Sequence, residues 1–222
     1  MVRVSFMEIK NLEKTIEELK NVSKKRNFKQ SIDLIVTLKG LDLKKPEHKL
    51  KFEIPIAVPF SDPKIGVFAD TLIPKVKPLE SQNVLLIRKD EIESYSKNKR
   101  LAKKTARECK SFLAEATLMP LVGKFLGPIL APRNKMPKPI PQTIPDVLPI
   151  VKREKATIKV ALKDSPVIQC AVGREDMSTE DLAKNVKTVL DSIESVLPAG
   201  KANINKIYIK TTMGGKPLRL II

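Results

Sequence analysis

Apolar residues recur every three or four positions near the start of the chain, a spacing that predicts an amphipathic helix over about residues 7–25. Its apolar face comprises Ile9, Leu12, Ile16 and Leu19. The period then changes to two in successive segments, which predicts two half-buried strands joined by a basic connection over 39–49. Their apolar sides comprise Ile32, Leu34, Val36 and Leu38 in the first strand, and Leu50, Phe52, Ile54, Ile56 and Val58 in the second.

The pattern changes again after the sequence Ser61-Asp62-Pro63. Three short runs are continuously apolar, as expected of strands buried on both faces of a parallel sheet. They cover residues 65–68, 84–87 and 111–116. A very basic helix is predicted over 97–110 and a short helix over 143–153. Because strands alternate with helices, this middle segment predicts a small α/β layer structure.

The period of two returns after Glu154 and continues beyond a turn at Asp164-Ser165-Pro166. The alternating apolar residues are Ala156, Ile158, Val160, Leu162, Ile168, Cys170 and Val172. Ser178 and Asp181 resemble a capping box and predict a helix that ends before Pro198. The core face of that helix comprises Leu182, Val186, Val189, Ile193 and Val196. Ile207 and Ile209 are expected to begin a strand, and a last strand is expected at 218–222.

The two ends of the chain resemble each other and differ from the middle. The sequence therefore predicts a discontinuous α+β domain, formed by 1–62 and 155–222, that is interrupted by an inserted α/β domain of Rossmann-like, three-layer type over 65–152. The chain would cross between the two domains at hinges near 61–64 and 152–155.

Residues 123–141, GKFLGPILAPRNKMPKPIP, contain five prolines and four cations, and no acidic residue lies between Glu115 and Asp146. Proline removes a backbone donor and restricts the residue before it, so we expect a rigid loop rather than a regular element. Its apolar residues favour partial burial. The segment thus predicts a rigid, positively charged loop that faces an anionic partner.

The 42 Lys and Arg residues outnumber the 25 Asp and Glu residues, and the formal net charge of +17 exceeds what solubility requires. This excess favours a polyanionic partner, above all nucleic acid. The alternative is a heat-adapted protein, but the surface of such a protein is enriched in charged residues of both signs.

No apolar run has the length of a membrane span, and the N-terminus does not resemble a signal peptide. Cys109 and Cys170 lack metal-site spacing and His48 is the only histidine, so we expect no metal, no cofactor and no histidine-based catalysis.

Three segments are candidates for contact with nucleic acid, and each has a plainer alternative. The basic helix carries two cationic stripes, Lys99, Lys103 and Lys110 beside Arg100, Lys104 and Arg107, which could equally be a solvated face. The segment 210–216 (KTTMGGK) is either a simple hairpin turn or a tip that allows close backbone approach to ribose. Phe28 stands among cations and either stacks on RNA or caps the core.

Residues 124–139, KFLGPILAPRNKMPKP, closely resemble the signature of the L1 family of large-subunit ribosomal proteins, which belong to the lateral stalk of the ribosome. The segments 211–214 and 28–33 resemble two further elements of that family, and the resemblance covers essentially the whole chain. Asn134 and Lys135 stand where bacterial members tend to have Gly and Leu, so the chain resembles the archaeal branch.

The resemblance implies a cytoplasmic protein of the large ribosomal subunit that acts as a monomer there, without enzymatic activity or membrane contact. It implies binding to a folded stalk region of large-subunit rRNA, help in releasing deacylated tRNA from the exit site, and repression of its own mRNA through an rRNA-like site. The implied central RNA contact comprises Phe28, Ser31, Thr212, Met213 and Gly214, with weaker contributions from Lys29, Arg174 and Lys216. A secondary basic surface would comprise Arg100, Lys103, Lys104, Arg107, Arg133, Lys135 and Lys138. Asn27 replaces a basic residue that is common in the family.

Two other functions remain as alternatives. The first is an RNA-processing enzyme with a Rossmann-like domain, but Gly123 and Gly127 form no phosphate-binding loop and Cys109 has no histidine partner. The second is a nonspecific nucleic-acid coating protein, whose affinity would depend on salt but not on the fold of the RNA.

Overall fold

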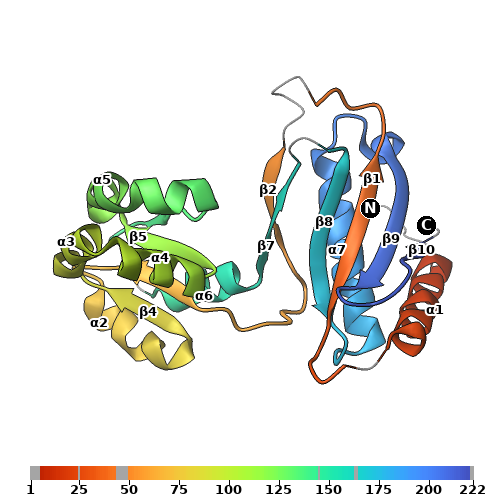
Figure 1. The fold of residues 1–222 in the computed structure, drawn as a ribbon, viewed down its shortest axis with the longest axis horizontal. Coiled ribbons are helices and arrows are strands. Elements are labelled where there is room, and N and C mark those ends of the chain that lie inside the picture. The colour runs from red at the N-terminus through yellow and green to blue at the C-terminus, as the bar shows by residue number, and fades with distance from the viewer. Residues whose placement is uncertain (1–5, 25, 44–49, 145, 163–164, 221–222) are drawn as a thin grey trace. The chain divides into compact units, whose positions relative to one another are not determined.

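The structure is a computed structural model that describes residues 6–24, 26–43, 50–144, 146–162 and 165–220 (Figure 1). The chain divides into two compact units. One unit combines both chain ends, Met1–Phe60 and Ala156–Ile222, and the other is the middle segment, Ser61–Lys155. Each unit has its own hydrophobic core.

The unit of the two chain ends contains a four-stranded antiparallel sheet in the order β10-β9-β1-β8, with two helices against one of its faces (Figure 1). A separate antiparallel ribbon of β2 and β7 contributes to the same core. The elements are α1 (Phe6–Val22), β1 (Ser31–Leu38), β2 (Lys51–Pro55), β7 (Thr157–Ala161), β8 (Val167–Arg174), α7 (Thr179–Val196), β9 (Ile204–Thr211) and β10 (Leu218–Leu220), with a 3₁₀ turn at Gly200–Asn203.

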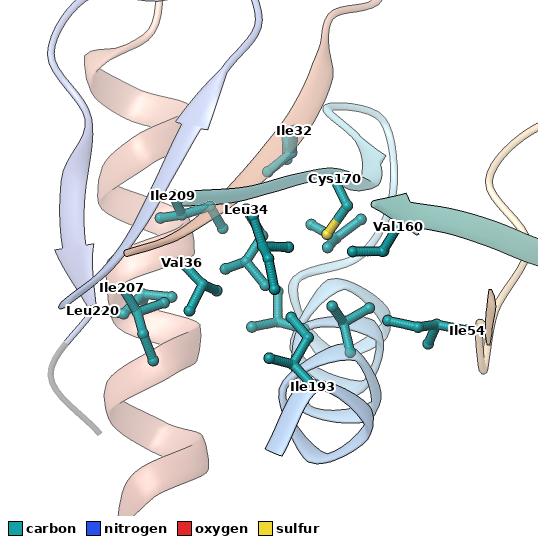
Figure 2. Close-up of a cluster of buried hydrophobic side chains, with 14 of the residues drawn as sticks. Ile32, Leu34, Val36, Ile54, Val160, Cys170, Ile193, Ile207, Ile209 and Leu220 are labelled. Carbon is teal, nitrogen blue, oxygen red and sulfur yellow. The ribbon is translucent and has the colours of Figure 1, made fainter. Parts of the chain in front are cut away.

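The predicted alternation in β1 is confirmed, because Ile32, Leu34 and Val36 are all fully buried. Figure 2 shows these side chains meeting residues of the neighbouring strands and of α7 in one apolar cluster. The predicted cap of α7 is also confirmed, since the Ser178 hydroxyl accepts a hydrogen bond from the Asp181 amide at 3.1 Å. Val196 was wrongly assigned to the core: it is 38% exposed because it lies in the last turn, where α7 ends.

The middle unit is built on a parallel sheet in the order β4-β3-β5-β6. Helices α3, α4 and α5 pack on one face of this sheet, and α2 and α6 pack on the other. The prediction of mixed α/β structure with a parallel sheet is therefore confirmed. The elements are β3 (Ile65–Phe68), α2 (Ile73–Val76), β4 (Val84–Ile87), α3 (Lys89–Lys97), α4 (Lys99–Glu108), β5 (Ser111–Glu115), α5 (Met119–Leu130), β6 (Lys138–Ile140) and α6 (Leu148–Lys155), with 3₁₀ turns at Lys77–Gln82, Ala116–Leu118 and Ala131–Arg133.

The expectation of a loop over 123–141 is wrong: its first half forms most of α5, and its second half contains a 3₁₀ turn at Ala131–Arg133 and the strand β6. The proline in the first turn of α5 costs no hydrogen bond, because a backbone amide at that position would have no acceptor within the helix. Only Pro128 lies inside the helix. The apolar face of α5 is buried at Val122, Leu126 and Leu130, and this burial outweighs the loss at Pro128. A left-handed residue, Asn134 with φ 54°, then ends the helical stretch before β6.

Several predicted boundaries also shift. The predicted basic helix over 97–110 is shorter in the structure, where α4 covers Lys99–Glu108 and Lys97 ends α3. The Asn98 side chain accepts the Leu101 amide at 3.2 Å and caps the start of α4. The first helix ends at Val22 rather than near 25, and the short helix α6 begins at Leu148 rather than near 143. Some residues used in the predictions from the sequence lie outside the described part of the chain, namely His48 within 44–49, Asp164, the side chain of Ile9, and residues 221–222.

A buried carboxylate joins three segments of the middle unit where its parallel strands end. Glu115, the last residue of β5, is fully buried and accepts the amides of Asp70 at 2.9 Å and Thr71 at 3.1 Å. The Thr71 hydroxyl and the Gln142 amide group also donate to it. Burial raises the pKa of Glu115, but these hydrogen bonds together outweigh burial and lower the pKa to about 2.

We predict that this carboxylate makes the unfolding free energy depend on acidic pH. The pKa of Glu115 is lowered in the folded state from 4.5 to about 2, so its contribution is present above pH 4.5 and is lost as the pH falls toward 2. The shift corresponds to about 3 kcal/mol. In urea denaturation, the unfolding free energy should fall more steeply between pH 4.5 and 2 in the parent than in Glu115→Gln, in which only the other carboxyls, such as Asp62 and Asp176, still contribute. The same pH dependence in both chains would contradict this role for Glu115.

Candidate nucleic-acid interface

Three segments that are far apart in sequence meet at one end of the four-stranded sheet. β1 begins there, while β8 and β9 end there, because both run antiparallel to β1. Ser31 lies opposite Arg174, and Ile32 lies opposite Thr211. Backbone pairing continues past the strands: the Thr212 amide donates to the Ser31 carbonyl at 2.9 Å. The segment before β1 and the turn after β9 are thereby held together.

The turn after β9 presents a small hydrogen-bonding group. The Thr212 hydroxyl lies 3.0 Å from the Ser31 carbonyl oxygen and 3.0 Å from Oδ2 of Asp33. A hydroxyl has one proton, so it can donate to only one of these acceptors at a time. The other acceptor keeps the capacity to receive a hydrogen bond from a bound molecule.

A buried pair of hydroxyls fixes the position of this turn. Thr211 is 1% exposed, and its Oγ1 lies 3.1 Å from Oγ of Ser23, just after the end of α1. The Ser23 hydroxyl also lies 2.6 Å from the Leu19 carbonyl oxygen, as a donor to it. The turn itself is closed by the Gly214 amide, which donates to the Thr211 carbonyl at 3.0 Å. Both α1 and the sheet therefore position residues 211–214.

Large apolar side chains are exposed around the same sheet end. Phe28 is 55% exposed, Met213 is 56% exposed, and Val22, next to Ser23, is 69% exposed. These three are half of the six large hydrophobic residues that are exposed in the described part of the chain. Since solitary exposed apolar residues are ordinary but a cluster is not, this gathering indicates a binding surface.

The charged residues at this end are not equivalent. Lys29 forms an ion pair with Asp176 at 2.6 Å, and this hydrogen bond lowers the pKa of the Asp176 carboxyl. Lys216 is exposed, and Arg174 is half-buried. Lys29 thus shares its charge with a carboxylate, while Lys216 is more open to an external anion.

The structure brings together all eight of the residues that the sequence proposed for the RNA contact: Phe28, Lys29, Ser31, Arg174, Thr212, Met213, Gly214 and Lys216. It also adds residues that the sequence did not single out, namely Val22, Ser23, Asp33 and Thr211. Asp33 follows Ile32 on the opposite side of the strand, so strand alternation alone could have identified it as facing away from the core.

The seven residues of the predicted secondary basic surface differ in their surroundings. Arg100, Lys103, Lys104 and Arg107 lie on the exposed face of α4. Lys135 instead donates to the carbonyls of Ala106 at 2.9 Å and Cys109 at 2.6 Å, and Lys138 pairs with the buried Glu154 at 2.6 Å. Arg133 is half-buried. The structure therefore directs Lys135 and Lys138 toward partners within the protein.

The described residues offer little for other chemistry. They contain no group of three or more His, Cys, Asp or Glu residues that could hold a metal ion. No described helix is both long and apolar enough to cross a membrane. Burial raises the pKa of the Cys109 thiol and raises that of Cys170 to about 12, so both remain protonated and unreactive near neutral pH.

Comparisons with known proteins agree on one family. The model of the Ribosomal protein L1p/L10e family matches residues 18–215. The chain is 46% identical over 201 residues to the large ribosomal subunit protein uL1 of Methanobrevibacter smithii, covering 90% of this chain and 93% of that protein. It is 43% identical over 205 residues to uL1 of Methanothermobacter thermautotrophicus, covering 90% and 93%, and 41% identical over 217 residues to uL1 of Pyrococcus horikoshii, covering 96% and 97%.

The geometry of the turn predicts opposite outcomes for two adjacent glycines. A Cβ on Gly214 would lie 1.8 Å from Oγ1 of Thr211, so Gly214→Ala must displace that hydroxyl from Ser23. A Cβ on Gly215 would meet nothing within 4 Å. We expect Gly214→Ala to lower the unfolding free energy by about 1–2 kcal/mol and Gly215→Ala to leave it nearly unchanged, as measured by urea denaturation. Equal stability of the two variants would show that the turn is not fixed in this way.

Proposed function

The chain belongs to the Ribosomal protein L1p/L10e family and is of its archaeal type, and from this premise we propose that the sheet end binds a folded stalk region of large-subunit rRNA. The family consists of structural proteins of the large ribosomal subunit, so the chain is a ribosomal protein and not an enzyme. Its place is the large subunit in the cytoplasm.

The observation that carries the proposal is the meeting of exposed apolar side chains with hydrogen-bonding groups on a fixed backbone. Phe28 and Met213 supply apolar surface for bases or sugars. An added Cβ on Gly215 would meet no protein atom within 4 Å, so the bare backbone at Gly215 allows RNA to approach closely. A folded RNA offers many ribose hydroxyls and few accessible base edges, which suits a surface built from backbone and hydroxyl groups.

Asp33 adds a reason for RNA to bind through its sugars at this point. A carboxylate repels phosphate but accepts a hydrogen bond from a ribose 2′-hydroxyl. Its Oδ2 is 3.0 Å from the Thr212 hydroxyl, which can turn toward the Ser31 carbonyl and leave the carboxylate oxygen to the RNA. Phosphates would then contact the flanking cations, Arg174 and Lys216.

The finer roles of the family extend this proposal. We propose that the chain helps to release deacylated tRNA from the exit site, and that it represses translation of its own mRNA through a site that mimics the rRNA. The second role needs no additional surface, because an mRNA with the same local fold would meet the same groups at the sheet end.

We also propose that the two units are separate domains with different tasks. The rRNA-binding domain would comprise 1–62 and 155–222, with 65–152 as an inserted domain and hinges near 61–64 and 152–155. In support, the units have separate cores, and the residues of the sheet end all belong to the unit of the chain ends. The chain would act as a monomer within the ribosome.

An exposed methionine in each unit provides a matched test of the binding surface. Met213 is 56% exposed at the sheet end, and Met136 is 40% exposed in the middle unit. We expect Met213→Asp to weaken binding of a stalk rRNA fragment at least a hundredfold, because a carboxylate would face RNA, and Met136→Asp to weaken it less than about threefold. Fluorescence anisotropy with the full chain would measure both. Thr212→Ala should also weaken binding of this fragment more than binding of an unrelated RNA.

An equal loss of affinity for the stalk fragment and for unrelated RNA would favour the nonspecific coating protein instead. If Met136→Asp and Met213→Asp weaken binding of the stalk fragment equally, the loss of affinity comes from the added negative charge and not from its place at the sheet end.

The domain proposal has its own test. A shortened chain that joins 1–62 directly to 155–222 should keep the stalk rRNA affinity to within about tenfold, because every residue of the sheet end remains. Calorimetric titration with the stalk fragment would measure this affinity, and circular dichroism would verify that the shortened chain is folded. Loss of nearly all specific binding by a folded shortened chain would place essential contacts in the middle segment.

A further inference from the structure

The helix α4 presents a second cationic surface, separate from the sheet end. Arg100, Lys103, Lys104 and Arg107 are exposed on it and, together with Leu101 and Asn98, line a surface depression of about 480 Å³. The opposite side of α4 is buried in the core of the middle unit through Ala102, Thr105 and Ala106. The cations therefore all lie on one side of a helix whose other side is fixed.

Both ends of α4 are held in place by hydrogen bonds. At its start, the Asn98 side chain accepts the Leu101 amide, and at its end, Lys135 donates to the carbonyls of Ala106 and Cys109. These bonds satisfy backbone groups that a helix end leaves open. The depression therefore rests on a rigid support rather than on a loose surface helix.

Three of the four cations of this face lack a compensating acid. Among the described residues, Arg100, Lys103 and Arg107 form no ion pair. Lys104 forms a long one, 4.0 Å from the carboxylate of Glu108, and Glu108 is shared with Lys64 at 3.6 Å. Like charges three or four residues apart on a helix destabilise it. An external anion would remove this repulsion, whereas a merely solvated face usually alternates charges of both signs.

We propose that the exposed face of α4 binds the phosphate backbone of double-helical RNA, as a second contact independent of the sheet end. The face has no aromatic side chain on which bases could stack, which favours contact with the backbone over single-stranded bases. Residues 100–107 span about 10 Å of helix, enough for two or three phosphates, and the half-exposed Leu101 lies among them against the sugars.

The choice of RNA rather than an acidic protein rests on the proposed function, since a chain that binds stalk rRNA through its sheet end has RNA close by. The sheet end combines cations with hydroxyl, carboxylate and apolar groups, whereas the depression on α4 is lined by four cations, Leu101 and Asn98. We therefore expect this second contact to be insensitive to RNA sequence and strongly weakened by salt.

The test compares two full-length triple variants that remove equal charge from the middle unit. One is Arg100→Gln, Lys103→Gln and Arg107→Gln on α4, and the other is Lys77→Gln, Arg88→Gln and Lys152→Gln at exposed positions outside α4. Binding of a short labelled duplex RNA of mixed sequence is followed by anisotropy over a range of salt concentrations. One molar equivalent of unlabelled stalk rRNA fragment occupies the sheet end, its tighter site, and leaves α4 open to the duplex. Glutamine keeps the helix propensity.

The α4 variant should bind the duplex at least tenfold more weakly at about 0.1 M salt, and its slope of log affinity against log salt should fall by about 2 to 3. The other variant should change less than about threefold. Equal losses in both variants, or no loss in either, would overturn the proposal. Competition by polyglutamate as effective as that by the duplex would assign the face to an acidic protein instead.

Failure of this proposal can be told apart from failure of the proposed function. If the stalk fragment binds no variant, the assignment of the sheet end fails, and the comparison of the two triple variants with the duplex still decides the role of α4. If the α4 variant keeps full affinity for the stalk fragment, the two surfaces are independent, as proposed. If it loses that affinity together with the duplex, α4 belongs to the stalk contact and is not a second one.

Discussion

The pairing register of β1 with β8 and β9 is the constraint on which the arrangement of the candidate interface depends. The even-numbered side chains of β1, from Ile32 to Leu38, are all buried in the core. A shift of one residue would turn these side chains to the opposite face and bring Asp33 into the core, at a cost of several kcal/mol. Core packing thereby also fixes Ser31 opposite Arg174 and Ile32 opposite Thr211, and it places three distant segments at one sheet end.

The parts of the fold that the sequence predicted are those in which burial has a clear period. The alternation of β1, the cap of α7 at Ser178 and the parallel runs of β3 and β4 all follow from local pattern. The helix α5 did not, because proline content argues locally against a helix while burial of Val122, Leu126 and Leu130 argues for one at long range. Only the packed structure shows that the gain from burying these three side chains exceeds the cost of a proline inside the helix.

The candidate site was predictable in a different way. The resemblance to family elements singled out Phe28 and Met213. Composition and spacing alone did not decide whether Phe28 binds RNA or caps the core, or whether the segment of Met213 is a binding tip or a simple turn. The Ser23–Thr211 contact joins residues 188 positions apart, and no local pattern can indicate it. Val22 occupies the last turn of an amphipathic helix, where a helical period does not distinguish a core residue from an exposed one.

The charge of +17 indicates the class of partner but not the place where it binds. Lys135 closes the end of α4, Lys138 neutralises a buried carboxylate, and Lys29 is paired with Asp176. By contrast, the sheet end depends mostly on uncharged groups. In the proposed function, specific recognition of RNA and general attraction to it would therefore arise from different residues, as expected when phosphate contacts position an RNA and other contacts select it.

The most direct test of the central claim is ultraviolet crosslinking of the full chain in its native large ribosomal subunit, with the crosslinked residues identified by mass spectrometry. We expect rRNA crosslinks at Phe28 and Met213, the two most exposed apolar side chains of the segments that flank β1 and β9. Crosslinks confined to residues 99–107 or 123–141, with none in 27–33 or 211–216, would contradict the assignment of the sheet end as the specific rRNA contact.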